Sequence, residues 1–174
     1  MSLGLMIPEN ESIVWRGPML MGALQQMLNQ VQWGEQDILF VDLPPGTGDV
    51  QLTLCQKTNL AGAIIVSTPQ DVALLDARKG IDMFKRLDIP ILGLIENMSS
   101  FICSGCGMTH HPFSHGSIEQ EAKKLKTEFL GELPLDLDTR AASDSGVPIV
   151  ASQPENPTAL AFSKIATRIG ELKF

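Results

Sequence analysis

The chain has 174 residues, of which 44% are hydrophobic and 19% charged, and its formal net charge is −7. This length and composition suffice for a packed core, and we expect one α/β domain over residues 1–174. The negative charge disfavours nucleic acid and anionic membranes as partners. Three cysteines suit a reducing compartment, and every apolar run is too short to span a bilayer, so we expect a cytoplasmic protein.

Short runs rich in Ile, Val and Leu alternate along the chain with segments of helical period. This alternation is typical of a parallel sheet covered by helices on both faces, so we predict a doubly wound, mostly parallel α/β fold. The predicted strands cover residues 3–7, 38–41, 63–67, 91–95 and 129–133.

Proline and capping residues mark where helices begin. A first helix is predicted after Gly17-Pro18, where proline suits the first turn. The segment 68–71, Thr-Pro-Gln-Asp, has the form of a capping box and predicts a helix that runs to about Leu87. Asn156-Pro157 predicts the start of the last helix. Further helices are expected over 118–126 and 138–143, with a turn at 146–148.

The run ILFVDLPPGTGDV, residues 38–50, places a carboxylate where an apolar strand meets a glycine turn. At such a position Asp42 can hold a magnesium-bound water, and the Gly46 amide, free of side-chain bulk, can approach a terminal phosphate. The alternative is that Asp42 only caps the turn. For Asp49 we expect only a capping role at the start of the next helix.

A second candidate site is the C-x-x-C motif of Cys103 and Cys106, in a predicted metal loop near residues 99–115. Thiolates at this spacing can grip one soft metal centre, but two sulfurs do not complete its coordination. A second copy of the chain or nearby histidines must supply the rest. The alternatives are an unligated reduced pair, or a zinc knuckle completed by His110 or His111.

Asn97 follows the predicted strand 91–95, and Pro134 follows the strand 129–133. Open α/β sheets bind ligands at the carboxyl ends of their strands, where an Asn amide can both donate to and accept from a base. The alternative for Asn97 is a turn-forming role.

Taken together, these motifs resemble the Mrp (ApbC-like) family of iron-sulfur cluster carrier ATPases, P-loop proteins related to MinD and ParA. The resemblance runs nearly end to end and in order. Its matching stretches are VWRGPMLMGALQQ (14–26), VDLPPGTGDVQLTL (41–54), STPQDVALLDARKG (67–80), GLIENMSSFICSGCG (93–107), FLGELPLD (129–136) and ASDSGVPIV (142–150).

The resemblance implies a homodimer that binds ATP and Mg²⁺ and carries a [4Fe-4S] cluster between the C-x-x-C pairs of two subunits. Asp42 would act through magnesium, and Gly46 would lie beside the γ-phosphate. Asn97 and Pro134 would flank the adenine. Cys103 with Cys106 would ligate the cluster, which would be delivered to apo iron-sulfur proteins or exchanged with cluster assembly factors.

The sequence departs from this family in one respect, because no G-x-x-x-x-G-K-[ST] loop occurs in the 174 residues. We therefore expect the chain to be a piece truncated at its N-terminus and deficient in ATP hydrolysis. The strand 38–41 would then lose its neighbour, which predicts a gapped or rearranged sheet and a tendency to associate. Two alternatives remain: a non-enzymatic zinc or iron-sulfur dimerisation module, and a MinD- or ParA-like positioning ATPase.

Overall fold

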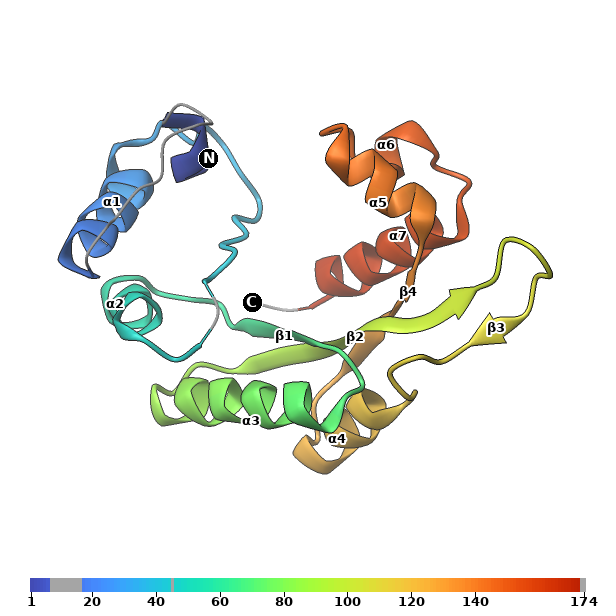
Figure 1. Ribbon diagram of the computed structural model, residues 1–174. Coiled ribbons are helices and arrows are strands. Elements are labelled where there is room, and N and C mark those ends of the chain that lie inside the picture. The colour runs from blue at the N-terminus through green and yellow to red at the C-terminus, as the bar shows by residue number, and fades with distance from the viewer. Residues whose placement is uncertain (7–16, 45, 173–174) are drawn as a thin grey trace. The chain divides into compact units, whose positions relative to one another are not determined.

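The computed structural model describes residues 1–6, 17–44 and 46–172, and the chain divides into two compact units, 1–59 and 60–174, each described here by itself. The first unit holds a 3₁₀ turn, Leu3–Met6, and the helices α1 (Gly17–Gln30) and α2 (Asp49–Lys57) (Figure 1). The two helices contact each other, and the Thr53 hydroxyl donates a hydrogen bond to the Met21 sulfur at 3.0 Å.

The second unit is built on a sheet whose central strand is β2 (Ile91–Ile102). β1 (Ala63–Ser67) and β4 (Phe129–Leu135) both pair with β2 in parallel. The short β3 (Thr109–His110) pairs antiparallel with the far end of β2, where Phe101 faces His110 on one edge and Leu135 of β4 on the other. β2 therefore belongs both to the sheet and to a hairpin that extends beyond β1.

Helices cover both faces of this sheet (Figure 1). α3 (Asp71–Arg86) and α4 (Ser117–Leu125) lie on one face, and α7 (Pro157–Gly170) lies on the other with α5 (Leu137–Asp144) and α6 (Ile149–Ser152) beside it. The core between the sheet and α7 consists of Ile95, Leu130, Leu133, Ile165 and Ile169. This arrangement confirms the predicted doubly wound, mostly parallel α/β fold.

Local sequence explains where two of these helices begin. The Asn156 side chain accepts a hydrogen bond from the Thr158 amide at 2.8 Å, and Pro157 occupies the first turn of α7. Asp136 caps α5, because its carboxylate accepts hydrogen bonds from the amide and the hydroxyl of Thr139 at 3.0 and 2.6 Å. Both helix starts therefore satisfy backbone amides that would otherwise lack a partner.

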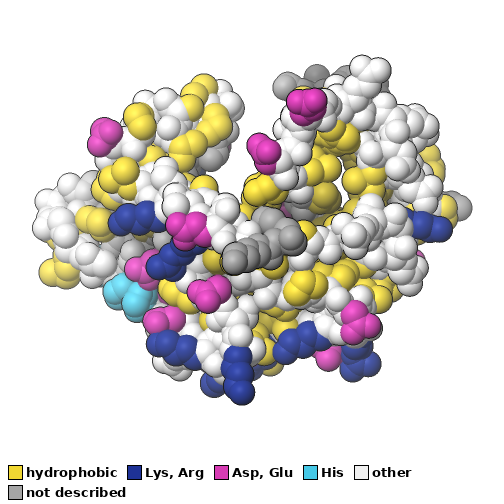
Figure 2. All heavy atoms as spheres, turned by 180° about the vertical axis from the view of Figure 1, so that it is seen from behind, with side chains coloured by type: hydrophobic (Ala, Val, Ile, Leu, Met, Phe, Trp, Pro, Cys, Tyr) yellow, Lys and Arg dark blue, Asp and Glu magenta, His cyan; other side chains and the backbone are white. Residues whose placement is uncertain are grey.

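Charged side chains of both signs are interspersed over α3 and α4, along the lower part of Figure 2. Several of them form ion pairs within one helix, such as Lys79 with Asp76 in α3 and Lys123 with Glu119 in α4. This surface is therefore a solvated face of mixed charge, with no single sign prevailing over these two helices.

The structure corrects several boundaries predicted from the sequence. The predicted strand 3–7 is a 3₁₀ turn over Leu3–Met6, and residue 7 lies outside the described residues. β2 and β4 continue past the predicted ends at residues 95 and 133, and β3 and α6 were not predicted. α3 begins at Asp71 after Gln70 without a side-chain cap, so the predicted capping box is wrong. α2 is capped by Gly48, and Asp49 lies inside its first turn.

The largest difference concerns the predicted strand 38–41, which has no strand structure in the first unit. Its four apolar side chains are 40%, 45%, 66% and 36% exposed. A strand exists only where its amides and carbonyls meet those of a neighbour, and an apolar pattern in the sequence does not specify that neighbour.

None of the described helices is both long and apolar enough to cross a membrane.

Candidate functional site

Cys103 and Cys106 lie in the tight loop that joins β2 to β3. The Cys103 amide donates to the Met108 carbonyl at 2.9 Å, and the Gly107 amide donates to the Cys103 carbonyl at 2.8 Å. Gly107 has a φ of +70°, a conformation that glycine adopts without the steric cost of a Cβ. These bonds close the loop on itself, so the C-x-x-C segment is held in one turn of the backbone.

The loop directs hydrogen-bond donors at the Cys103 sulfur. The backbone amides of Gly105 and Cys106, followed by the Cys106 thiol, lower the pKa of Cys103 from its ordinary value of 9.0. Cys103 is half-buried and Cys106 is exposed. A thiolate with a lowered pKa beside a second accessible sulfur is the form that ligates soft metal ions. The pair therefore offers two convergent sulfur ligands at the tip of a hairpin.

The third cysteine differs from this pair in setting and in chemistry. Cys55 lies in α2 of the first unit, and burial raises the pKa of its thiol. Cys55 therefore remains protonated at pH values where Cys103 ionises more readily.

The histidines near the loop do not complete a metal site with the cysteines. His111 Nδ1 lies 2.7 Å from the Ser99 carbonyl oxygen, and His115 Nε2 lies 2.8 Å from a carboxylate oxygen of Glu132. Within 1–6, 17–44 and 46–172, no third His, Cys, Asp or Glu donor gathers with the two sulfurs. The described structure therefore does not gather His110 or His111 with the two sulfurs, and the zinc knuckle stays a prediction.

The sequence predicted Asn97 just after the end of a strand, but Asn97 lies within β2. Its side-chain oxygen accepts a hydrogen bond from the Met98 amide at 3.0 Å, and Met98 has a φ of +54°. The pairing of β2 with β4 is irregular between Asn97 and Phe101. Asn97 thus accompanies a local distortion within the strand and does not form a turn.

Pro134 lies in a groove of about 340 Å³ between the end of β4, the cysteine loop and the start of α7. Asn97 does not line this groove, although it pairs with Leu133, the residue before Pro134. The groove contains both apolar surface and hydrogen-bonding groups. Its lining residues are Phe101, Ile102, Ser104, Pro134, Leu135, Asp136, Leu137, Asp138, Asn156, Pro157 and Thr158.

Asp42 and Gly46 belong to the first unit. Asp42 is exposed in a segment without regular structure, and Gly46 has a φ of +95°, which favours glycine at this position. The turn is fastened to α2, because the buried Gln51 side chain donates a hydrogen bond to the Pro44 carbonyl at 2.6 Å. An exposed carboxylate beside a fastened glycine turn has the chemistry needed for a magnesium-bound water and a phosphate.

Comparison with known proteins assigns the chain to a family. The family model for ParA, described as the NUBPL iron-transfer P-loop NTPase, matches residues 1–170. The chain belongs to this family. The resemblance found in the sequence is thereby confirmed.

Curated relatives of this chain carry iron-sulfur names. The chain is 49% identical over 169 residues to the iron-sulfur cluster transfer protein NUBPL of Dictyostelium discoideum, covering 97% of this chain and 52% of that protein. It is 47% identical over 170 residues to the iron-sulfur cluster carrier protein of Pseudomonas fragi, covering 98% and 59%. The chain thus spans about half the length of the curated relatives it matches.

Solved structures support the family fold. A nucleotide-binding protein from Archaeoglobus fulgidus, described as a complex with ADP with cobalt found by PIXE, is 39% identical at a TM-score of 0.69, covering 83% of this chain and 58% of that one. The cell division ATPase MinD of Pyrococcus furiosus has a TM-score of 0.62, covering 88% and 58%, but only 22% identity. MinD therefore supports the fold alone.

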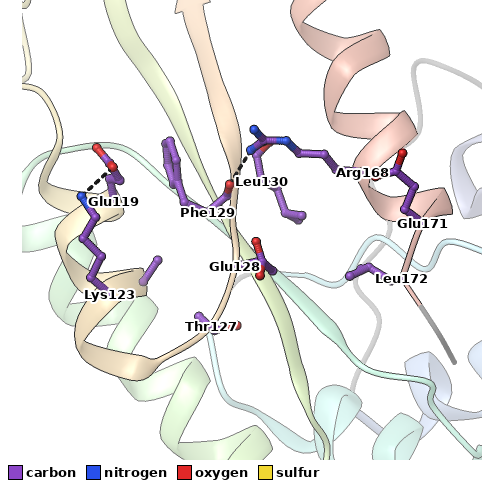
Figure 3. A pocket seen from close by; sticks show the side chains of 10 residues that line it. Glu119, Lys123, Thr127, Glu128, Phe129, Leu130, Arg168, Glu171 and Leu172 are labelled. Atoms are coloured by element: carbon purple, nitrogen blue, oxygen red, sulfur yellow. Dashed lines mark hydrogen bonds and ion pairs between the residues drawn. The ribbon is translucent and has the colours of Figure 1, made fainter.

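A larger groove of about 590 Å³ lies at the start of β4 in this family member, away from the predicted site residues (Figure 3). Its two basic side chains already have partners. Lys123 pairs with Glu119 at 2.7 Å, and Arg168 donates to the carbonyl oxygens of Phe129 and Leu130 at 2.7 and 3.1 Å. The first pair lies within α4, and the second set of bonds joins α7 to β4. The basic side chains of the groove are therefore used in packing the helices on the sheet.

Sequence reasoning overlooked Glu96, which is fully buried in β2. Its two carboxylate oxygens accept hydrogen bonds from the amides of Gly116 and Ile118, at 3.0 and 3.1 Å, at the N-terminus of α4. An ionisable side chain at the end of the apolar run 91–95 was the available signal, because a polar group buried there requires a partner. Glu96 thus connects the sheet to the loop that precedes α4.

Proposed function

We propose that the chain binds an iron-sulfur cluster through Cys103 and Cys106 and passes it to recipient proteins. The observation that carries the proposal is the cysteine loop, where two sulfurs converge and backbone amides favour the thiolate form of Cys103. Membership of an iron-transfer family supports the same reading. The cluster is cargo, so an exposed loop suits its transfer better than a closed site.

A single chain supplies two thiolates, whereas a [4Fe-4S] cluster takes four cysteine ligands. The described residues offer the pair no third donor. We therefore infer that two chains meet at their cysteine loops across a twofold axis and share one [4Fe-4S] cluster. Closed twofold pairing is the commonest symmetry of homo-oligomers, and it brings the same loop from each chain to one axis.

We further infer that nucleotide binding is part of the activity. Asp42 would hold a magnesium-bound water and Gly46 would lie near the terminal phosphate of ATP, while Asn97 and Pro134 would flank the base. The relative described in complex with ADP supports nucleotide binding by the family. Pro134 and Ser104 line one groove, so a base flanked by Pro134 there would contact the cysteine loop, whereas Asn97 lies outside that groove.

For these 174 residues by themselves we propose binding without efficient ATP hydrolysis, since the sequence holds no glycine-lysine phosphate loop. Phosphoryl transfer depends on positioning and charge neutralisation, which that loop supplies. The test is steady-state phosphate release compared with the Asp42→Ala variant. Equal rates are expected, and a wild-type rate at least tenfold above the variant would contradict the proposal.

The partners we propose are apo iron-sulfur proteins and cluster assembly factors, in the cytoplasm. A reduced thiol pair is the form that accepts a cluster, and a reducing compartment maintains it. Incubating the loaded chain with an apo iron-sulfur enzyme tests this directly. Recovery of that enzyme's activity is expected at a rate faster than with free iron and sulfide.

Anaerobic reconstitution with iron and sulfide tests the central proposal. The wild type is expected to become coloured and to bind about four iron atoms per two chains, while its mass shifts to that of a dimer. Cys103→Ala and Cys106→Ala are each expected to lose colour and dimerisation, whereas Cys55→Ala, the matched control, retains both. A colourless wild type that takes up stoichiometric zinc would instead establish a zinc-binding dimerisation module.

A further inference from the structure

We propose that Glu96, His115 and Glu132 form a second metal site, separate from the cysteines, for a divalent first-row transition ion. One ligand atom from each of the three side chains lies within 4.8 Å of the other two. They come from three different segments: β2, the loop before α4, and β4. The proposal does not depend on the iron-sulfur function, because none of these residues belongs to the cysteine loop.

The backbone holds the three residues together before any ion binds. Glu96 and Glu132 are register partners in the parallel pairing of β2 with β4, so their side chains leave the same face of the sheet. Glu96 accepts the Gly116 amide, which fixes the residue directly after His115. Gly116 has a φ of +79°, and the chain turns there into α4. The helix cap therefore positions the imidazole beside the carboxylates.

The charges at this position favour a cation. Two carboxylates on directly opposite positions of neighbouring strands repel each other. Two amides at the N-terminus of α4 donate to Glu96, whereas the Glu132 carboxylate has only the His115 ring, at 2.8 Å, as a hydrogen-bond partner among the described residues. Glu119, in the first turn of α4, also interacts electrostatically with His115. A divalent ion between Glu96 and Glu132 would relieve this accumulation of negative charge.

The donor set selects the class of ion. One imidazole nitrogen and two carboxylate oxygens suit zinc, iron(II), cobalt(II) or manganese better than calcium or magnesium, which prefer oxygen ligands alone. Each Glu96 oxygen makes one hydrogen bond and keeps a lone pair for a metal. Three protein ligands leave a coordination position open to water or to a further ligand.

The site is accessible from solvent on one side. The side chains of His115 and Glu132 are 48% and 51% exposed, whereas Glu96 is fully buried, so an ion would reach the buried carboxylate past the two exposed ligands. Histidine side chains reach the molecular surface in Figure 2. The His111 ring lies 4.6 Å from the His115 ring, with its Nδ1 bonded to the Ser99 carbonyl, and it would flank the ion.

Cobalt(II) titration of the full chain carrying Cys55→Ser, Cys103→Ser and Cys106→Ser tests the proposal without thiolate ligands. One cobalt per chain is expected, with no sulfur-to-cobalt charge-transfer absorption. His115→Ala and Glu132→Gln, both at exposed positions, are each expected to weaken binding at least tenfold. The paramagnetic ion should also broaden the His115 ring resonances in proton NMR spectra before those of His110.

The controls are His110→Ala and Glu128→Gln, which change an exposed histidine and an exposed glutamate outside the cluster. Both are expected to leave cobalt affinity unchanged. Glu96→Gln is less informative, because it also alters the cap of α4. Absence of saturable binding in the cysteine-free chain would overturn the proposal. So would an equal loss of affinity in His110→Ala and His115→Ala, or competition by magnesium at concentrations equal to those of cobalt.

Discussion

Arg78 of α3 and Glu121 of α4 form a two-pronged ion pair, with Arg78 Nε 2.8 Å and Nη2 2.6 Å from the two carboxylate oxygens. The Glu121 side chain is only 8% exposed, and the hydrogen bond from Arg78 lowers the pKa of its carboxyl group. The pair joins the two helices that cover one face of the sheet. Its planar geometry is specific to a guanidinium facing a carboxylate.

We expect Arg78→Ala to lower the free energy of unfolding, because it leaves the Glu121 carboxylate buried without its main partner. Arg86→Ala is the matched control, since Arg86 pairs with Asp82 on the exposed surface of the same helix. Urea unfolding should show a clearly larger loss for Arg78→Ala. Equal losses for the two variants would mean that the buried pair contributes no more than a surface pair.

The core between the sheet and α7 depends on Leu130, which is 2% exposed and packs with Ile165 and Ile169. Leu130→Ala should lower the free energy of unfolding by about 3 kcal/mol, the typical cost of a buried leucine truncated to alanine. Leu160→Ala, at a site that is 44% exposed, is the control. Thermal or urea unfolding monitored by circular dichroism measures both, and a loss below about 1 kcal/mol for Leu130→Ala contradicts the packing described.

The cap of α5 should contribute a pH-dependent part of the stability. Burial opposes ionisation of Asp136, but hydrogen bonds from Thr139, Asp138 and Thr158 together outweigh it and lower the pKa below the ordinary 3.8. The contribution is thus fully present above the unfolded pKa and is lost as the pH falls through the folded one. Asp136→Asn keeps a capping side chain without the charge.

We therefore expect the stability difference between the wild type and Asp136→Asn to be constant near neutral pH and to shrink once the pH falls below about 3.8. Asp138→Asn, exposed in the first turn of α5, serves as the control. Unfolding free energies measured across this range check the sign. A difference that grows on acidification would refute a lowered pKa for Asp136.

Cys103 and Cys55 should react at different rates with iodoacetamide in the metal-free, reduced chain. Hydrogen bonds from Gly105 and Cys106 lower the pKa of Cys103, whereas burial raises that of Cys55. Because the thiolate is the reactive form, alkylation of Cys103 should outpace that of Cys55 severalfold near neutral pH. Mass spectrometry of peptides sampled over time gives both rates, and faster labelling of Cys55 would contradict the assignment.

Features encoded by short-range chemistry were predictable from the sequence. The strand Ala63–Ser67 and the Asn156-Pro157 start of α7 were confirmed, because an apolar run and a side-chain cap are local properties. The end of β2 was not predictable in the same way. Glu96 and Asn97 have the polarity of a strand end, but the N-terminus of α4 accommodates the Glu96 charge within the sheet. That helix lies 20 residues further along the chain.

In the candidate site, too, local features were predictable and features that depend on distant residues were not. The C-x-x-C spacing predicted that the two sulfurs would share one turn, and the loop geometry agrees. The cluster of Glu96, His115 and Glu132 depends on strand register and on a helix cap, and neither is visible in a single motif. The run 38–41 was apolar enough to predict a strand, but the pairing that a strand requires is a property of the whole sheet.

β2 continues from the buried Leu94 to Ile102, so the cysteine loop lies at the end of a strand that begins in the core. Between these two residues, the Ser99 hydroxyl donates a hydrogen bond to the Leu133 carbonyl at 3.3 Å and so links β2 to β4. The backbone therefore connects the cysteine loop directly to the buried part of β2. The cysteine loop is therefore held at the end of a strand anchored in the core, with Cys106 exposed at its tip.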